Sequence, residues 1–212
     1  MKILDCTLRD GGYHTNWEFE PDFVRDLITT LDKVGIDVIE LGYKSPLPGG
    51  KYKKCNDKFI ENTLGFIPKA KLSFMVDTKD FVVNNKLDYN LIKTNIRKNS
   101  IFGMCRVATT IDFLDHAKEF VGHLHSIGYE TTINLVRASL LDKKTLQKAI
   151  NDCDKSDVDV LYLADSFGSI TPDKLSEFLK IYRDNTDKKI GFHAHNNIGL
   201  GFSNTLLAMN SG

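Results

Sequence analysis

The chain has 212 residues, and its 28 Lys and Arg balance its 28 Asp and Glu, so the formal net charge is zero. This balance argues against a nucleic-acid binder, which usually carries a basic excess. Apolar residues make up 42% and charged residues 26% of the chain, which is typical of a globular protein and excludes disordered and collagen-like classes. The sequence also lacks an apolar run of the roughly 18 residues that a membrane span needs.

The N-terminal residues and the spacing of the cysteines both bear on where the protein is located. The first ten residues carry too many charges for a signal peptide. The cysteines are widely spaced and form no Cys-x-x-Cys pair, which does not suit a thiolate zinc site; they are Cys6, Cys55, Cys105 and Cys153. We therefore expect reduced thiols in a cytoplasmic protein, folded as a single domain with a sizeable core.

Seven short runs rich in Val, Ile, Leu and Phe predict β-strands, and a helix-length segment follows each of them. Repeated units of this kind, roughly 25–35 residues apart, are typical of a parallel sheet whose strands are connected by helices. In chain order, the predicted strands cover residues 2–9, 37–43, 71–77, 104–110, 131–137, 160–166 and 189–195.

Helix signals fill the segments between these strands. Apolar stripes at helical spacing predict helices over residues 21–31 and 113–126, and each is followed by a glycine that acts as a stop signal. Thr171 and Pro172 mark another helix start, and residues 202–209 form the seventh predicted helix. Residues 44–57, rich in Pro, Gly and Lys, are expected to form a long loop.

Two architectures fit this order of elements: a closed barrel and an open doubly wound sheet. Several predicted strands alternate an apolar face with a polar face, and the polar face carries Glu40, Arg106 and Asn134. Helices cover both faces of an open sheet, so both should be apolar, whereas a barrel can hold polar side chains around a site. We therefore predict an α/β fold of the TIM (β/α)8-barrel type.

Only seven strands are recognisable, and the eighth βα unit has no counterpart in the sequence. We expect one barrel domain over residues 1–212 that is truncated at its C-terminus, or a barrel closed by a homo-oligomer or a partner segment.

The sequence contains two His-x-His pairs. His123 and His125 lie in a predicted helix, where side chains two positions apart diverge, so they are a poor ligand pair. His193 and His195 lie on a predicted strand and share one face near its C-terminal end, where barrel active sites lie. Two imidazoles on one face suit a divalent metal, although such a pair also occurs without one.

Asp10 ends the first predicted strand, and two glycines follow it as a turn signal. One carboxylate with His193 and His195 would leave coordination positions open for a substrate, which suits a Lewis-acid centre. The alternative role for Asp10 is a turn cap. Arg9 could bind a carboxylate or an oxyanion, or form an ion pair with Asp10, Asp5 or Glu40. His14, in a predicted loop, is a candidate general base or a surface histidine.

The remaining polar residues allow a structural and a functional interpretation. Glu40 and Arg106 are expected to form a structural ion pair, because buried charges must be paired. Asp165 ends the sixth strand as a turn anchor or a rim residue. Lysines in the 44–57 loop, including Lys44, are expected to be solvated rather than to line an anion site. Four residues are candidate substrate contacts: Glu40, Arg106, Asn134 and Asp165.

Three segments together resemble one enzyme superfamily. Residues 4–12, LDCTLRDGG, resemble the opening D-x-T-L-R-D-G motif of the DRE-TIM metallolyases, and residues 193–200, HAHNNIGL, resemble their metal-binding segment. Residues 163–168, LADSFG, are similar to their sixth-strand segment, and RVAT at 106–109 is most similar to the 4-hydroxy-2-oxovalerate aldolase branch.

The resemblance implies roles for particular residues. Asp10, His193 and His195 would be ligands of Mn²⁺ or Mg²⁺, and Arg9 would contact the keto or enolate oxygen of a small 2-oxo acid substrate. His14 is the nearest match to the catalytic histidine of the related aldolases, at an offset spacing.

The implied activity is cleavage of a 4-hydroxy-2-oxo acid to pyruvate and an aldehyde, through an enolate stabilised by the metal. Two alternatives stay open: a Claisen-type acyl-CoA lyase or synthase, and a barrel fragment that binds metal without turnover. No nucleic-acid or membrane partner is expected.

Overall fold

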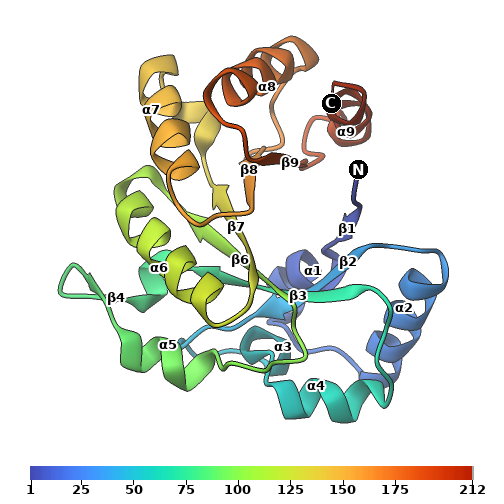
Figure 1. Cartoon of the computed structure of the whole chain (residues 1–212). Coiled ribbons are helices and arrows are strands. Elements are labelled where there is room, and N and C mark those ends of the chain that lie inside the picture. Colours follow the sequence, from blue (N-terminus) through green and yellow to red (C-terminus); the bar gives the residue numbers. More distant parts are fainter. Residues whose placement is uncertain (212) are drawn as a thin grey trace. The chain divides into compact units, whose positions relative to one another are not determined.

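The computed structural model describes residues 1–211, and Figure 1 labels their helices and strands. Within these residues the chain divides into two compact units. We call residues 1–106 with 126–130 the carboxylate unit, because it contains Asp10 and Glu40. The rest of the described chain, residues 107–125 and 131–211, contains His193 and His195 and is called the imidazole unit. Strand β6 (Met104–Thr109) supplies residues to both units, and so do the helix that ends at Ser126 and the strand that begins at Glu130.

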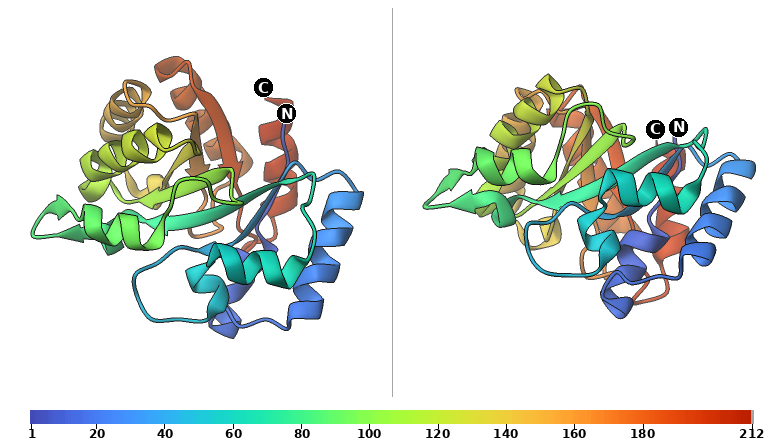
Figure 2. Two further views of the ribbon diagram at one scale, coloured as in Figure 1. Left: turned by 60° about the horizontal axis from the view of Figure 1, so that its bottom comes forward. Right: turned by 90° about the horizontal axis from the view of Figure 1, so that it is seen from below.

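In the carboxylate unit, three parallel strands alternate with helices. Leu4 lies opposite Val38, and Val38 in turn lies opposite Lys71, which fixes the register of the three strands. The strands are β1 (Leu4–Asp5), β2 (Val38–Tyr43) and β3 (Lys71–Asp77). The helices are α1 (Thr7–Thr15), α2 (Pro21–Lys33), α3 (Lys51–Lys54), α4 (Asp57–Leu64) and α5 (Tyr89–Asn95). Helices α2 and α4 pack against each other (Figure 2).

In the imidazole unit, three further parallel strands alternate with longer helices. Leu161 lies opposite Ile190 in the register of the last two strands. The strands are β7 (Glu130–Leu135), β8 (Val160–Ala164) and β9 (Lys189–His193). The helices are α6 (Leu114–Ser126), α7 (Lys143–Asp154), α8 (Pro172–Asn185) and α9 (Gly201–Asn210), with short 3-10 turns at Ile111–Phe113 and Ala138–Leu140.

The strands follow one another in the sheet in the order β1-β2-β3-β6-β7-β8-β9. An open doubly wound sheet requires a point at which this order reverses, and a TIM barrel does not. The sequential parallel order therefore confirms the predicted barrel-type fold with seven strands.

Burial explains why these segments form these elements. All six residues of β2 are buried, as expected for a strand covered on both faces. Helix α2 turns Val24 and Ile28 inward, and α7 does the same with Leu146 and Ile150. Each such side chain contributes about 1.5–3 kcal/mol of burial free energy. Among the described residues, no helix combines the length and apolar character needed to cross a bilayer.

The first predicted strand is much shorter than the sequence pattern indicated. Residues 2–9 were predicted as one strand, but only Leu4–Asp5 pair in the sheet, and α1 begins at Thr7. The Asp5 carboxylate accepts hydrogen bonds from the backbone N–H of Thr7, at 3.0 Å, and from its hydroxyl, at 2.9 Å. This local turn ends the strand, because an Asp side chain can replace a strand partner for the backbone two residues on.

The expectation of a solvated loop at residues 44–57 is wrong for Lys44. Its ammonium group is buried, donates to Asp57 at 2.5 Å, and lies about 5 Å from the ring centres of Phe74 and Phe102. Helix α3 also lies within this segment.

A hairpin and a short turn before it were not expected from the sequence. Strands β4 (Val82–Val83) and β5 (Lys86–Leu87) pair in antiparallel fashion after the 3-10 turn Thr78–Phe81. Asn84 and Asn85 connect them with φ of 50° and 58°, a conformation that Asn tolerates better than most residues.

Candidate active site

Arg9 and Asp10 lie on helix α1, not at the end of a strand as predicted. Gly11 and Gly12 also lie within this helix rather than in a sharp turn. A Cβ atom at Gly12 would lie 2.0 Å from the ring of Trp17, so this glycine makes room for a close aromatic contact. The Trp17 indole N–H donates to the Arg9 carbonyl oxygen at 2.9 Å, which holds the helix against the ring.

The Arg9 guanidinium is buried between two carboxylates. Its Nε donates to Glu40 Oε2 at 3.0 Å, and its Nη1 donates to Asp10 Oδ1. Burial alone would lower the pKa of Arg9, but Glu40 and Asp10 outweigh it and raise the pKa above the ordinary value. Arg9 therefore stays positively charged at neutral pH.

Glu40 connects Arg9 to a second buried guanidinium. Arg106 Nη1 donates to Glu40 Oε2 at 2.6 Å, and both side chains are fully buried. The predicted ion pair of Glu40 and Arg106 is thus confirmed, and Arg9 extends it to three charged groups. Because these groups bind one another, Glu40 and Arg106 hold the site together; whether they also contact a substrate stays untested.

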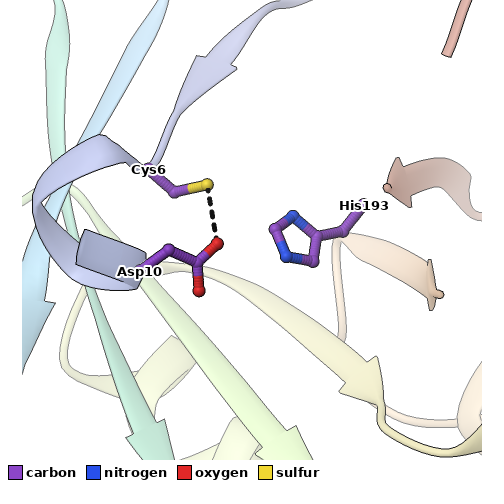
Figure 3. A group of neighbouring side chains, drawn as sticks. All are labelled: Cys6, Asp10 and His193. Atoms are coloured by element: carbon purple, nitrogen blue, oxygen red, sulfur yellow. Dashed lines mark hydrogen bonds between the residues drawn. The ribbon is translucent and has the colours of Figure 1, made fainter. Parts of the chain in front are cut away.

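A cysteine also binds the Asp10 carboxylate. Figure 3 shows the Cys6 thiol beside Asp10, and the Sγ–H donates to Asp10 Oδ2 at 3.5 Å. Burial raises the pKa of Cys6 to about 12. The thiol therefore remains protonated at neutral pH and acts as a hydrogen-bond donor. The Asp10 side chain keeps about a third of its surface exposed, so its oxygens remain accessible to a ligand.

Two tyrosines near Arg9 were not identified as candidate site residues from the sequence. The hydroxyls of Tyr13, on α1, and Tyr43, at the end of β2, lie 2.7 Å apart and are hydrogen bonded. Tyr43 is buried, and burial raises the pKa of its hydroxyl above the ordinary value, with Arg9 opposing part of that rise. Helical spacing from Asp10 would have pointed to Tyr13, but the segment was taken for a strand and a turn.

His193 and His195 bring their rings together, but they do not share a strand as predicted. His193 is the last residue of β9, whereas His195 lies in the loop that follows. Their Nε2 atoms lie 3.1 Å apart, and their ring centres 4.8 Å apart. Two ligands at right angles on one cation, each about 2.1 Å from it, would be separated by about 3.0 Å. The pair therefore fits a divalent cation, and it also fits a single N–H···N hydrogen bond.

Asp165 anchors the turn after β8, which is the structural one of the two roles predicted for it. Its carboxylate accepts from the backbone N–H of Ser169, at 3.1 Å, and of Ile170, at 3.2 Å. Its own N–H donates to the His193 carbonyl oxygen at 2.9 Å. Asp165 therefore fixes the chain at the end of β9, from which the two histidines project.

The other candidate residues have mainly local contacts. Asn134 is buried on β7 and accepts a hydrogen bond from the Thr132 hydroxyl at 2.8 Å. His14 lies on helix α1 rather than in the predicted loop, and its side chain is exposed. His123 and His125 lie on α6 as predicted. The distance from His125 Nδ1 to Asp159 Oδ2 is 3.8 Å.

Known proteins with similar sequences include one named as an aldolase and one named as a decarboxylase. A 4-hydroxy-2-oxovalerate aldolase of Pelotomaculum thermopropionicum is 26% identical over all of this chain and 62% of its own length. An oxaloacetate decarboxylase of Mycobacterium tuberculosis is also 26% identical, over 99% of this chain and 61% of its own length. The chain thus spans less than two thirds of the length of these relatives.

The fold and sequence also match a solved structure. The N-terminal domain of a Bacteroides vulgatus protein, named only provisionally as an aldolase, superposes with a TM-score of 0.82. It is 30% identical and matches all of this chain and 70% of its own length. The HMGL-like family model matches residues 1–212, and the chain therefore belongs to the HMGL-like family.

Proposed function

We propose that this chain is the catalytic barrel of a divalent-metal-dependent aldolase, which cleaves a 4-hydroxy-2-oxo acid to pyruvate and an aldehyde. The observation that carries the proposal is the separation of 3.1 Å between the His193 and His195 Nε2 atoms, at the strand end where barrel enzymes bind substrates. The names of the similar aldolases support the substrate class.

We propose Asp10, His193 and His195 as the ligands of one Mn²⁺ or Mg²⁺ ion. Two imidazoles with one carboxylate leave coordination positions free for a chelating substrate. The oxygens of that substrate and of Asp10 would supply the oxygen donors that these metals prefer. When bound, the cation would supply Lewis-acid chemistry, which withdraws electron density from the 2-keto group.

Arg9 would stabilise the negative charge that develops during cleavage. As the C3–C4 bond breaks, its electron pair enters the pyruvate enolate, and the C4 hydroxyl loses its proton to become an aldehyde. A guanidinium that is already positioned and always charged lowers the energy of this enolate without reorganisation. Glu40 and Asp10 hold Arg9 in that state.

The similarity to an oxaloacetate decarboxylase favours one second candidate. Decarboxylation of oxaloacetate breaks the bond between C3 and its carboxylate, and it leaves the same pyruvate enolate. The residues proposed here could serve both reactions, because each stabilises the enolate and not the group that leaves. The size and polarity of the leaving group would then decide between the two substrates.

Pyruvate release from purified protein tests the proposal. The protein is treated with EDTA and then given Mn²⁺, with 4-hydroxy-2-oxopentanoate or oxaloacetate as substrate, and pyruvate is detected with lactate dehydrogenase. We expect chelation to abolish release and Mn²⁺ to restore it. His193→Ala should remove activity, whereas His125→Ala, which alters an exposed histidine on α6, should retain it.

Two outcomes would change the assignment. Pyruvate release that is indifferent to EDTA would remove the metal role, and a requirement for an acyl-CoA substrate would favour the Claisen-type alternative. Metal binding without turnover would favour a fragment that needs an eighth βα unit from a partner segment or an oligomer. A cytoplasmic location stays a prediction.

A further inference from the structure

Aldol cleavage needs a group that moves protons, and helix α1 presents one that the sequence analysis did not identify. Tyr13 lies one turn beyond Arg9 and Asp10 on α1. Residues three and four positions apart are neighbours on a helix surface, with Cβ atoms about 5–6 Å apart. The Tyr13 side chain is therefore on the part of the helix that carries the two charged groups assigned to the reaction.

The surrounding rings hold the Tyr13 hydroxyl in place. Its hydrogen bond to the Tyr43 hydroxyl is 2.7 Å long. The Trp17 ring lies edge-on to both tyrosines, with centroid separations of 4.7 Å from Tyr13 and 5.5 Å from Tyr43. Trp17 also binds the Arg9 carbonyl oxygen, so one indole ties the tyrosines to the helix that carries the site. A fixed pair of hydroxyls is a suitable path for proton transfer.

The two hydroxyls differ in their access to water. Tyr13 is 63% exposed and can meet a substrate, whereas Tyr43 is 9% exposed. Burial keeps the Tyr43 hydroxyl protonated before the reaction. A mechanism through this pair must therefore return a proton to each tyrosine that gives one away.

We propose that Tyr13 and Tyr43 form a proton relay for the aldol cleavage, in which Tyr13 moves the proton and Tyr43 positions it; this inference rests on the proposed function. The C4 hydroxyl proton moves to the Tyr13 oxygen as the C3–C4 bond breaks. Tyr13 gives its own hydroxyl proton to C3 of the enolate, which becomes the methyl group of pyruvate. Tyr43 keeps its proton and holds the Tyr13 hydroxyl in place through their hydrogen bond.

The relay is balanced and needs no external acid or base. Tyr13 gains one proton and loses one, and Tyr43 keeps its own. The substrate loses a proton at the C4 oxygen and gains one at C3, which is the net change of the reaction. His14, the base expected from the sequence, lies on the same helix with an exposed side chain and has no assigned step in this path.

The test compares single variants of the Mn²⁺-loaded protein in two assays. The first assay measures kcat for pyruvate release from 4-hydroxy-2-oxopentanoate. The second follows exchange of the pyruvate methyl protons in D₂O by NMR, which reports proton transfer at C3 without cleavage. Tyr13→Phe and Tyr43→Phe keep the rings and remove only the hydroxyls, and Tyr89→Phe on α5 is the matched control.

We expect Tyr13→Phe to lower kcat and the exchange rate by about 100-fold or more, with Mn²⁺ affinity unchanged. Tyr43→Phe, which removes only the positioning hydrogen bond, should lower both by a smaller factor, about 10-fold. Tyr89→Phe should match the wild type in both assays. If both relay variants stay within a few-fold of wild type, the relay is wrong. Loss of activity in His14→Gln with retention in Tyr13→Phe would assign the proton transfer to His14 instead.

The assays also separate this inference from the proposal beneath it. A wild-type protein that neither releases pyruvate nor exchanges its methyl protons with Mn²⁺ present would refute the proposed function, and the relay with it. A wild type that is active in both assays beside unaffected tyrosine variants would refute the relay alone.

Discussion

The carboxylate unit and the imidazole unit hold their proposed functional groups in different ways. In the first, Arg9 is cross-linked through Glu40 to Arg106, and all three side chains are buried. In the second, His193 and His195 are half-buried and lie against each other at a strand end. The first region is a network of compensated charges, and the second is a pair of rings that can exist uncharged.

Physical chemistry explains this difference. Two buried guanidiniums are tolerated only with carboxylates beside them, so the charged network must be complete in the folded protein. A neutral imidazole has a much smaller desolvation penalty and can remain half-buried. We therefore expect substitutions in the charged network to affect folding first, and substitutions of the histidines to affect metal binding first.

The largest effect should come from Glu40→Gln. This change leaves two buried guanidiniums without their shared carboxylate, which costs about 3–5 kcal/mol of unfolding free energy. Urea denaturation followed by circular dichroism measures the change. Asp22→Asn is the control. Asp22 and Arg25 form an ion pair in which both side chains are well exposed. Loss of this pair should therefore cost under about 1 kcal/mol of unfolding free energy. Equal effects of the two substitutions would contradict the account of the buried network.

His193→Ala should show the opposite balance. We expect it to weaken Mn²⁺ binding by at least about 100-fold, because one of three protein ligands is lost. Its unfolding free energy without metal should change by less than about 1 kcal/mol, since the ring is only partly buried. Calorimetric titration and urea denaturation give the two values. A large loss of stability with intact Mn²⁺ binding would assign His193 to the core instead.

Acid should destabilise the carboxylate unit through Asp57. Burial would raise the pKa of Asp57, but hydrogen bonds from Lys44 and Ser100 lower it overall. A carboxyl with a lowered folded pKa contributes stability above its unfolded pKa, near 3.9, and that contribution is lost as the pH falls through the folded value. Unfolding free energies measured between pH 7 and pH 2 should therefore decline at the acid end.

The Asp57→Asn variant checks the source of that decline. It should be less stable at pH 7, and its stability should fall less than that of the wild type on acidification. An unchanged pH profile in Asp57→Asn would show that other carboxyls carry the acid sensitivity.

The smallest effect is expected from Asp142→Ala in the imidazole unit. Asp142 caps helix α7 by accepting from the Thr145 backbone N–H at 2.9 Å, and such caps are worth about 1 kcal/mol. Thermal unfolding shows whether this change shifts one transition of the whole chain or only part of it. A shift in the α7 region alone, seen by hydrogen exchange, would mean that the two units unfold separately.

Much of the fold was predictable because burial and alternation leave clear marks on sequence. The apolar runs identified all seven parallel strands, and the polar residues within them predicted the Glu40–Arg106 pair, since buried opposite charges must meet. Helix α1 was missed because LDCTLRDGG alternates like a strand and ends in two glycines. The role of Gly12 depends on Trp17, whose position is a tertiary contact that local pattern does not reveal.

The same limit applies to Lys44 and to the tyrosine pair. Lys44 looked like one of several loop lysines, and only Phe74 and Phe102, distant in sequence, show it to be buried. Tyr13 and Tyr43 meet across 30 positions, and no short motif links them. The histidine pair was easier to identify, because its members are two residues apart at a strand end.

Mn²⁺ binding to the single-residue variants tests the central claim most directly, that Asp10 and the two histidines share one cation. Electron paramagnetic resonance can count bound Mn²⁺ in the wild type and in Asp10→Asn, His193→Ala and His195→Ala. We predict one tightly bound ion per chain in the wild type, and its loss in each of the three variants. Tight binding that persists in Asp10→Asn while both histidine variants lose it would place the cation on the imidazoles alone and contradict the shared site.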